Sequence, residues 1–329
     1  MAVKRREISF REAVREALLQ EMERDPTVFM MGEDLQLFFG GGNFAVTKGF
    51  LEKFGPERIR DTPISEAAFL GAGAAAAATG LRPVVEIMYV DFFGVCMDQL
   101  YNQAAKMRYI SGGQIKVPLV IRMVFGAGTS EAAHHSQTLY SIFAHVPGLK
   151  VIVPSTPYDA KGLLITAIRD DDPCIYFEHK LLYSKKGYVP EEEYSIPFGE
   201  AEIKREGADV TVIALGLMVH TALEAAEKLE EEGVSLEVVD PRTIVPLDKK
   251  TILNSVKKTS RLVIVDEDYE RCGLASEIAA LVSDEGFDYL DAPIKRVATP
   301  NVPIPFSPPL ERAVIPDVEK IMAAVREIM

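Results

Sequence analysis

The chain of 329 residues is longer than one hydrophobic core usually supports, so two domains are expected. Apolar residues make up 48% of the chain and charged residues 26%, as in globular proteins, and no apolar run reaches the roughly 18 residues of a membrane-spanning helix. The net charge of −13 argues against nucleic acid as a partner, because phosphate binding needs a basic surface.

The three cysteines, Cys96, Cys174 and Cys272, lie far apart and form no CxxC pair. Such a set does not build a disulfide framework, and the first residues of the chain lack the apolar core of a secretory signal. We therefore expect three buried thiols in a reducing compartment, the cytoplasm.

The first half of the chain predicts an α/β domain with a parallel sheet. Ser9 and Glu12 have the spacing of a capping box, so a first amphipathic helix begins near residue 9. After it, β-branched runs alternate with helical patterns, as in βαβ units. The expected strands lie within 27–34, 81–90, 116–126, 149–154 and 173–179, and the expected helices at about 92–110 and 157–170.

A second, smaller α/β domain follows. Residues 181–200 interrupt the alternation with Pro, Gly, Tyr and a charge run, which predicts a linker between a domain at 1–180 and a domain at 201–329. In the second domain we expect strands at 209–216, 234–240, 261–267 and 294–300, and helices at about 217–232, 249–258, 274–284 and 316–328.

The Gly/Ala-rich stretch after residue 66 allows two interpretations. Gly71, Gly73 and Ala76 have the G-x-G-x-x-A spacing of a dinucleotide-binding turn, which must directly follow a strand. Thr62 and Pro63 are instead expected to be the N-cap and first residue of a helix that contains these glycines, which disfavours a nicotinamide-binding enzyme. Glycine within a helix costs about 1 kcal/mol relative to alanine, so its repetition indicates that another helix, a subunit or a flat ligand approaches the backbone. A buried central helix with nothing bound explains the small residues equally well.

Glu66 stands in the first turn of this predicted helix. The helix N-terminus stabilises its anion, which would make it an ordinary dipole residue. Burial among apolar neighbours would instead raise its pKa and let it share a proton near neutral pH. Position alone leaves both interpretations open.

Two loops that follow predicted strands are further candidates. Phe92 and Phe93 come after the strand at 81–90, where the carboxyl ends of parallel strands gather ligands. They would be equally ordinary as core residues. His134 and His135 lie in a Gly/Ala/Ser-rich loop that has neither a metal-ligand spacing nor a G-x-S-x-G motif, so a zinc site and a serine hydrolase are disfavoured. Spacing and composition do not name a reaction.

Six segments of the chain keep a distinctive order and spacing. They are GED at 32–34, DTPISE at 61–66, LRPVVEIMYVDFFGVCMDQLYNQAAKMRYISGG at 81–113, HSQ at 135–137, PGLKVIVPSTPYDAKGLL at 147–164 and VPEEEYSIPFGEA at 189–201. Together they resemble the β subunit of the thiamine-diphosphate-dependent first component of 2-oxo acid and acetoin dehydrogenase complexes. The resemblance runs from about residue 7 to the end, and it implies a pyrimidine-binding domain followed by a transketolase-type C-terminal domain.

The resemblance implies a cofactor site. Glu66 would hydrogen-bond N1′ of the aminopyrimidine and favour the imino tautomer that deprotonates the thiazolium C2, a role that requires a raised pKa. Phe92 would lie against the pyrimidine ring, with Ile64 beside it. Glu33 matches an acidic residue linked to proton communication between paired active sites.

The resemblance also assigns a role to the histidine loop. His135 aligns with the HSQ histidine, which is implied to assist substrate binding and acyl transfer to lipoamide. Many relatives have Gln where this chain has His134, so which imidazole faces the substrate stays open.

The family carries its Mg²⁺ and diphosphate site, a GDG motif followed by Asn, on the α subunit, and this sequence contains no GDG. The resemblance therefore implies an α₂β₂ heterotetramer with thiamine diphosphate between α and β and the Gly/Ala helix near a subunit contact. A second implied partner is the dihydrolipoyl acyltransferase core with its lipoyl domain, whose basic binding module would suit an acidic C-terminal domain.

Relatives also hold a structural potassium ion. One such relative has Asn at the position of Asp172, which leaves the identity of the ion open. A solvated helix end before a turn is an equal alternative for residues 169–173. The matching positions are Leu119, Ala167, Ile168, Asp170 and Asp172.

The expected function is decarboxylation of a 2-oxo acid (pyruvate or a branched-chain acid) or cleavage of acetoin, followed by reductive acylation of lipoamide. The alternatives are a stand-alone transketolase-like or NAD-dependent enzyme, which the missing GDG motif disfavours, and a non-catalytic assembly subunit. Retention of Glu66, Phe92 and His135 disfavours the last.

Overall fold

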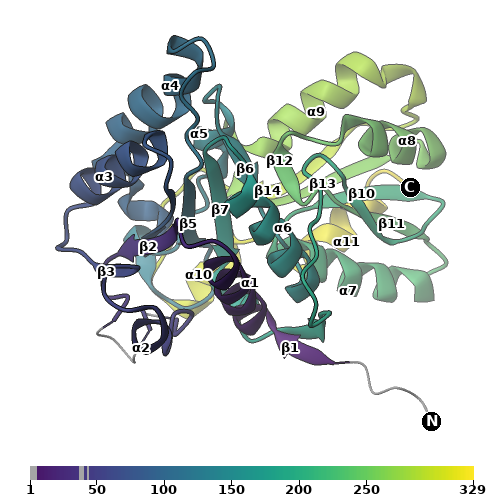
Figure 1. The fold of residues 1–329 in the computed structure, drawn as a ribbon. Helices are drawn as coiled ribbons and strands as arrows, with labels where there is room; N and C mark the ends of the chain where they lie inside the picture. The colour runs from purple at the N-terminus through teal and green to yellow at the C-terminus, as the bar shows by residue number, and fades with distance from the viewer. Residues whose placement is uncertain (1–5, 37–40, 43) are drawn as a thin grey trace. The chain divides into compact units, whose positions relative to one another are not determined.

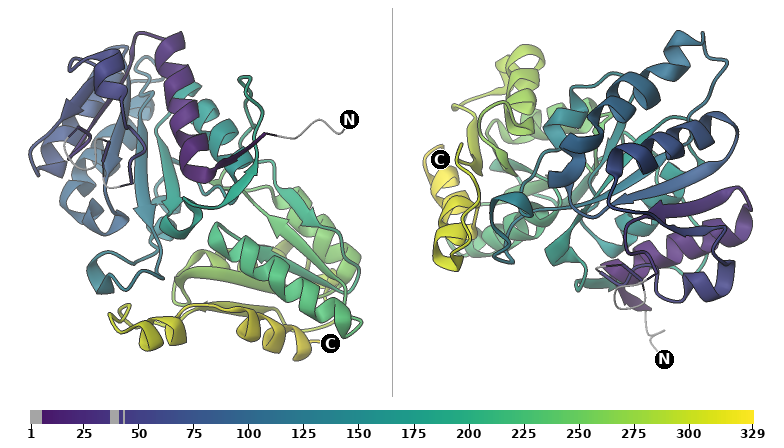
Figure 2. Two further views of the ribbon diagram at one scale, coloured as in Figure 1. Left: turned by 90° about the horizontal axis from the view of Figure 1, so that it is seen from below. Right: turned by 90° about the vertical axis from the view of Figure 1, so that its left-hand side faces the viewer.

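The computed structural model describes residues 6–36, 41–42 and 44–329. Contacts divide the chain into two compact units (Figures 1 and 2). The first combines the chain up to Phe125 with Ile142–Phe198, and the second combines Gly126–Ser141 with Gly199–Met329. Each unit has a largely parallel sheet with helices, so the predicted α/β fold class is confirmed.

Six strands of the first unit pair in parallel, in the order β6-β7-β5-β4-β2-β3. Every residue of β2, β5 and β7 is buried, which explains the continuous apolar runs, because both faces of such a sheet are covered. The strands are β2 (Val28–Gly32), β3 (Ile59–Asp61), β4 (Arg82–Ile87), β5 (Val120–Phe125), β6 (Lys150–Ile152) and β7 (Cys174–His179).

The helices of the first unit include the one predicted at the N-terminus. Ser9 and Glu12 form the expected capping box, with Glu12 N donating to Ser9 Oγ at 3.2 Å and Ser9 N donating to Glu12 Oε2 at 2.7 Å. The helices are α1 (Phe10–Arg24), α2 (Phe50–Phe54), α3 (Glu66–Ala78), α4 (Ala105–Ile110) and α6 (Pro157–Arg169). Helix α1 packs against α6. The short strands β1 (Glu7–Ser9) and β8 (Lys186–Tyr188) pair antiparallel.

The predicted helix at 92–110 is not one α-helix. The chain forms a 3₁₀-helix, η1 (Val90–Cys96), then a π-helical stretch, η2 (Gln99–Ala104), before α4. Apolar periodicity over so short a stretch does not separate these helical types, because their residues per turn differ too little. The thiols also depart from expectation, since Cys96 and Cys174 are buried but Cys272 is exposed.

The sheet of the second unit has the order β14-β13-β10-β11-β9, and only β9 runs antiparallel to its neighbour. Its strands are β9 (Glu202–Arg205), β10 (Val210–Ala214), β11 (Leu236–Asp240), β13 (Leu262–Tyr269) and β14 (Lys295–Thr299), and the unit also contains β12 (Thr243–Val245). Its helices are α7 (Leu217–Glu231), α8 (Lys249–Thr259), α9 (Leu274–Glu285), α10 (Pro308–Val314) and α11 (Val318–Arg326). Short 3₁₀ turns are η4 (Lys180–Leu182) in the first unit and η5 (Phe287–Tyr289) in the second.

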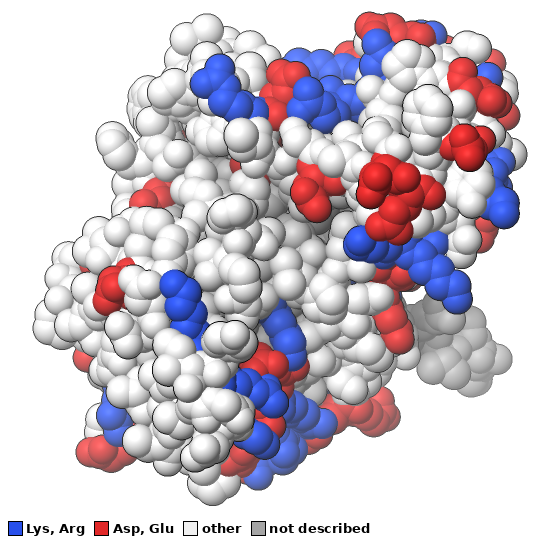
Figure 3. All heavy atoms as spheres, turned by 90° about the horizontal axis from the view of Figure 1, so that it is seen from above, with Lys and Arg blue, Asp and Glu red and all other residues white. Residues whose placement is uncertain are grey.

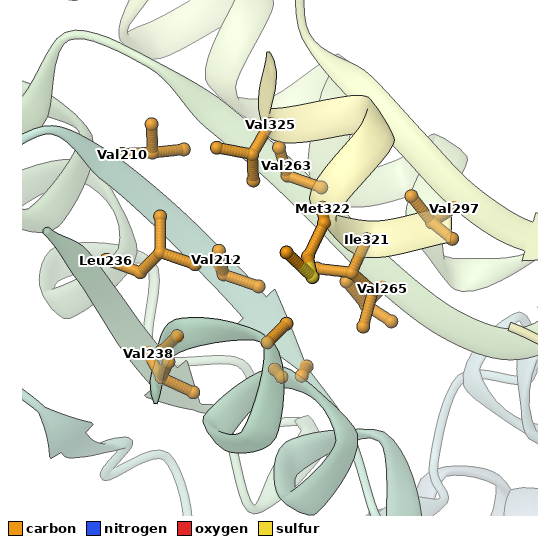
Figure 4. Packing of buried hydrophobic residues seen from close by; sticks show 14 of the residues in the cluster. Val210, Val212, Leu236, Val238, Val263, Val265, Val297, Ile321, Met322 and Val325 are labelled. Atoms are coloured by element: carbon orange, nitrogen blue, oxygen red, sulfur yellow. The ribbon is translucent and has the colours of Figure 1, made fainter. Parts of the chain in front are cut away.

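The core of the second unit lies between its sheet and the helices α7 and α11, which contact each other. Figure 4 shows valines of the central strands, such as Val212 and Val265, beside Ile321 and Met322 of α11. The last helix begins after Asp317, whose side chain accepts a hydrogen bond from Lys320 N, as the predicted start near residue 316 requires.

The segment 126–141 groups with the second unit although it lies within the first half of the sequence. It contains the 3₁₀ turn η3 (Ala132–His134), and the short helix α5 (Tyr140–Ala144) follows it. Both candidate histidines therefore belong to the second unit, an association that the sequence analysis does not indicate.

The surface carries acidic and basic side chains intermixed, with uncharged stretches between them in the face drawn in Figure 3. Within the part of the chain that the structure describes, no helix combines the length and the apolar character needed to cross a membrane.

Candidate functional site

Glu66 is the first residue of α3, and this residue is only 8% exposed. The prediction that Thr62 caps this helix and Pro63 begins it is wrong by three residues, since Ser65 is the N-cap. Thr62 N donates to Gly32 O at 3.0 Å, which continues the pairing of β3 with β2, so the chain stays extended through this residue.

Gly71 and Gly73 lie inside α3, as predicted, and not in a turn after a strand. A Cβ on Gly73 would lie 2.7 Å from Val85 Cγ2 on β4, so this glycine permits close packing of the helix on the sheet. The dinucleotide-binding interpretation of the spacing is therefore rejected, because the glycines have a packing role in a helix that has already begun.

Glu33 and Glu66 form a pair of buried acids. Glu33 follows β2 and Glu66 follows β3, its parallel neighbour, so both lie beyond the carboxyl ends of adjacent strands. Burial raises the pKa of Glu33 to about 7, and the negative charges of Glu66 and then Asp34 raise it too. Glu33 Oε1 is buried and has no hydrogen-bond partner among the described residues. Glu33 can therefore hold a proton near neutral pH.

Phe92 and Ile64, the two residues expected to contact the pyrimidine ring, also follow strands of this sheet. Phe92 is in η1, which follows β4, and is half-buried with an edge contact to Tyr89 at 5.7 Å between centroids. Its neighbour Phe93 is a core residue, 2% exposed and 4.2 Å from the Phe143 ring centroid. Ile64, 85% exposed, precedes α3. The ends of β4, β2 and β3 thus carry one half-buried ring, one exposed aliphatic side chain and two buried acids.

Burial also raises the pKa of the Cys96 thiol to about 12, and the charge of Glu66 contributes to this shift. Cys96 Sγ lies 3.3 Å from Phe93 O. The Cys96 thiol therefore stays uncharged near Glu66 and does not act as a nucleophile.

The two candidate histidines differ in exposure. His134 ends the turn η3 and is exposed, whereas His135, the next residue, is half-buried. His135 N donates to Ala132 O at 3.5 Å, and Gly126 N donates to Gln137 O at 3.2 Å. The turn Ala132–His134 and the hydrogen bond between Gly126 and Gln137 both shape the backbone that carries the histidines.

The residues expected to bind potassium lie around the C-terminal end of α6. Arg82 Nη1 donates to Ile168 O and to Asp170 O, both at 2.9 Å. Lys150 Nζ lies 2.6 Å from Asp170 Oδ1 and 3.3 Å from Asp172 Oδ2. Two cationic side chains of the protein thus already bind the carbonyl and carboxylate oxygens at the centre of this cluster.

The remaining two positions are also engaged. Leu119 O accepts a hydrogen bond from Cys174 N at 2.9 Å, and Ala167 O accepts one from Asp170 N at 3.3 Å. The charged side chains of the cluster are Asp170, Asp171 and Asp172 with Arg82, Arg108, Lys116 and Lys150. Four basic side chains face three aspartates, so net charge does not favour a further cation here. A carbonyl oxygen that accepts one hydrogen bond keeps a second lone pair, so the expected ion site stays a prediction.

A buried ion-pair network in the first unit was not found from the sequence. Arg122 on β5 binds Glu178 on β7 through two hydrogen bonds, of 2.6 and 2.8 Å, and Glu86 on β4 at 2.5 Å. Burial disfavours the Arg122 cation, but the two carboxylates more than compensate and hold its pKa above the usual range. The sequence does contain a signal for this network, because each of the three apolar strands has one charged residue in its interior: Glu86, Arg122 or Glu178.

The fold and two family models define a transketolase-type chain with two domains. Residues 6–186 match the family model of the transketolase pyrimidine-binding domain, and residues 199–321 match that of the transketolase C-terminal domain. A solved chain titled "Split gene transketolase, inactive beta4 tetramer" has the same fold, with a TM-score of 0.80 at 24% identity over 98% of both chains.

Within this class, the sequence is 51% identical to the acetoin:2,6-dichlorophenolindophenol oxidoreductase subunit beta of Bacillus subtilis, over 98% of each chain. It is 46% identical to the 2-oxoisovalerate dehydrogenase subunit beta of the same organism, again over 98% of each. The chain belongs to the family of β subunits of acetoin and 2-oxo acid dehydrogenases, which confirms the resemblance inferred from the sequence.

Proposed function

We propose that this chain is the catalytic β half of a thiamine-diphosphate-dependent dehydrogenase, which decarboxylates a 2-oxo acid or cleaves acetoin and then reductively acylates lipoamide. The observation that carries the proposal is the buried pair of Glu66 and Glu33, one of which can hold a proton near neutral pH. The names of the relatives, which include acetoin and 2-oxo acid dehydrogenase subunits, support the reaction class.

The residues present fit the aminopyrimidine half of thiamine diphosphate. Glu66 would bind the ring nitrogen N1′ through its carboxyl group, and the half-buried Phe92 and exposed Ile64 would contact the ring. The unpartnered Oε1 of Glu33 provides a second buried acceptor beside Glu66. When bound, thiamine diphosphate supplies a nucleophilic carbon and an electron sink for cleaving the bond next to a carbonyl.

The chain's own residues would then control protons. Because Glu33 and Glu66 lie close enough for their charges to interact, one proton shared by the pair lowers its charge repulsion. Glu33 would hold this proton near neutral pH and exchange it with the carboxyl group of Glu66. His135, half-buried on the loop of the second unit, would bind substrate and assist acyl transfer, whereas the exposed His134 would not.

The proposed partners are an α subunit, in an α₂β₂ heterotetramer, and a dihydrolipoyl acyltransferase core. The α subunit would hold Mg²⁺ and the diphosphate. The outer face of α3 exposes Ala68, Ala72 and Ala75, which suits a close subunit contact. Potassium at the expected positions stays a prediction, and Arg82 and Lys150 bind oxygens of the same cluster. The cytoplasmic location stays a prediction.

The test combines the chain with a family α subunit and measures reduction of 2,6-dichlorophenolindophenol with thiamine diphosphate, Mg²⁺ and acetoin, pyruvate or branched 2-oxo acids. We expect no activity from the chain alone. In the assembled enzyme, Glu66→Gln should lower kcat by at least about 100-fold, because the amide cannot transfer the proton.

The matched control is Glu57→Gln, which makes the same charge change at a side chain that is 91% exposed. Sedimentation of each complex separates a lost activity from a lost assembly. Activity of the lone chain would refute the half-site, and an assembled but fully active Glu66→Gln enzyme would refute the role of Glu66. Inactivity of the wild-type complex on every substrate would favour an assembly subunit.

A further inference from the structure

The segment 126–141, which carries both histidines, has a backbone that needs external support. Ser130 and Ala132 have φ angles of 58° and 60°, in the left-handed region that side chains other than Gly, Asn and Asp rarely adopt. Residues 128 and 129 are exposed, so apolar burial does not hold this part of the segment. A strained backbone persists only where its surroundings impose it.

Glu311 supplies this support from the far end of the sequence. Glu311 is only 2% exposed, and both oxygens of its carboxylate contact the segment. Oε1 accepts from Gly128 N at 2.8 Å, both oxygens lie 3.2 Å from Ser130 N, and Ser130 Oγ lies 3.3 Å from Oε2. Hydrogen bonds to an ionised carboxylate are among the stronger ones in proteins.

Two neighbouring acids hold the ends of the same segment. Ala127 N donates to Glu267 Oε1 at 2.6 Å, and Tyr140 Oη donates to Asp266. Glu267 and Asp266 lie on β13, so the ends are attached to the sheet. Glu311 is the acid that contacts the middle, immediately before the turn that leads to His135.

The direction of the Glu311 carboxylate excludes an ordinary helix-terminus role. Glu311 lies in the first turn of α10, where an acid usually interacts with the N–H groups of its own helix. Here both oxygens accept instead from residues more than 180 positions earlier in the chain. Its hydrogen bonds therefore serve the segment 126–141.

We propose that Glu311 is a positioning residue for the active-site histidine. Its carboxylate holds the backbone at Gly128 and Ser130, and the turn Ala132–His134 transmits this constraint to His135. The catalytic part of this inference rests on the proposed function of His135. The structural part does not, and the two are tested separately.

The structural test is hydrogen–deuterium exchange of the whole chain, read on peptides covering 126–139. Glu311→Gln removes the charge and turns an amide donor toward backbone donors, so the amides of Gly128 and Ser130 should exchange at least about tenfold faster. Peptides of β10 and β11 should not change. Glu285→Gln is the control, since it removes one charge from an exposed ion pair with Lys249 in the same unit.

Unchanged exchange at 126–139 would overturn the proposal. If Glu311→Gln fails to fold, Glu311→Asp replaces it, because the aspartate keeps the charge but withdraws the carboxylate by one methylene. This variant must then show faster exchange confined to 126–139, and wild-type exchange there would equally overturn the proposal.

The catalytic test is a double-mutant cycle in the assembled enzyme. Misplacing a reacting group by about 1 Å costs on the order of 100-fold, so Glu311→Gln should lower kcat/KM by about 10- to 100-fold. In a His135→Ala background the same substitution should have little further effect, because it acts through that imidazole. If the losses in kcat/KM from Glu311→Gln and His135→Ala add in the double variant, Glu311 has a merely structural role and the proposal that it positions His135 is wrong. If Glu311→Gln exchanges faster at 126–139 but the wild-type complex is inactive, only the proposed function is refuted.

Discussion

At the scale of single residues, burial decides the charge of the acids beside α3. Glu33 has a pKa of about 7 against an ordinary value of 4.5, so the folded chain binds this proton more tightly than the unfolded chain does. The resulting stabilisation is complete below pH 4.5 and is lost as the pH rises to about 7. The contribution of Glu33 to the free energy of unfolding therefore falls over this interval.

Glu33→Gln tests this sign, because the amide stays neutral at every pH. At pH 8 the variant should be more stable than the wild type by about 1 kcal/mol, a value reduced from the full pKa shift to allow for solvent screening. At pH 5 the difference should nearly vanish. Urea unfolding at both pH values measures it, with Glu57→Gln as the exposed control. A variant that is less stable than the wild type at pH 8 would contradict the assignment.

At the scale of elements, α3 packs on β4 so closely that the usual helix preference is reversed at one glycine. Alanine replaces glycine in a helix with a gain of about 1 kcal/mol. A Cβ at Gly73 would meet the buried Val85 Cγ2 at 2.7 Å, and the next nearest atom, on Leu119, at 3.6 Å. A Cβ at Gly71 would meet only Gln99 Cγ, at 3.1 Å, on a flexible side chain.

The two glycines of α3 should therefore respond with opposite signs. Gly73→Ala should lower the free energy of unfolding by about 1–3 kcal/mol, as overpacking of a core does. Gly71→Ala should leave it unchanged or raise it by up to about 1 kcal/mol. Urea unfolding of the two variants decides the matter, and equal effects would show that packing on β4 does not constrain the helix.

At the scale of the whole molecule, the net charge of −13 favours association with a basic partner. The proposed docking to the basic module of an acyltransferase core should then be steered by charge. Raising NaCl from about 50 to 500 mM shortens the screening length to a few ångströms, so the association rate should fall by about tenfold or more. Stopped-flow mixing measures this rate, with sucrose at matched osmolarity as the control. A rate independent of salt would refute steering.

The sequence by itself determined the elements that depend on near neighbours. The Ser9–Glu12 capping box, the buried apolar strands and the placement of Glu66 in the first turn of a Gly/Ala helix follow from residues a few positions apart. The family resemblance added the expected roles of Phe92 and His135, which stay predictions. Local periodicity was insufficient where helical types differ little, as in η1 and η2.

Only the tertiary structure decided which distant groups meet. Arg122 between Glu86 and Glu178, and Glu311 on Gly128, join residues from 36 to 183 positions apart. No sequence period encodes such pairs, because strand order and loop paths set them. The proton affinity of Glu33 likewise depends on the desolvation and neighbouring charge that folding creates, so it is a property of the folded chain and not of its local sequence.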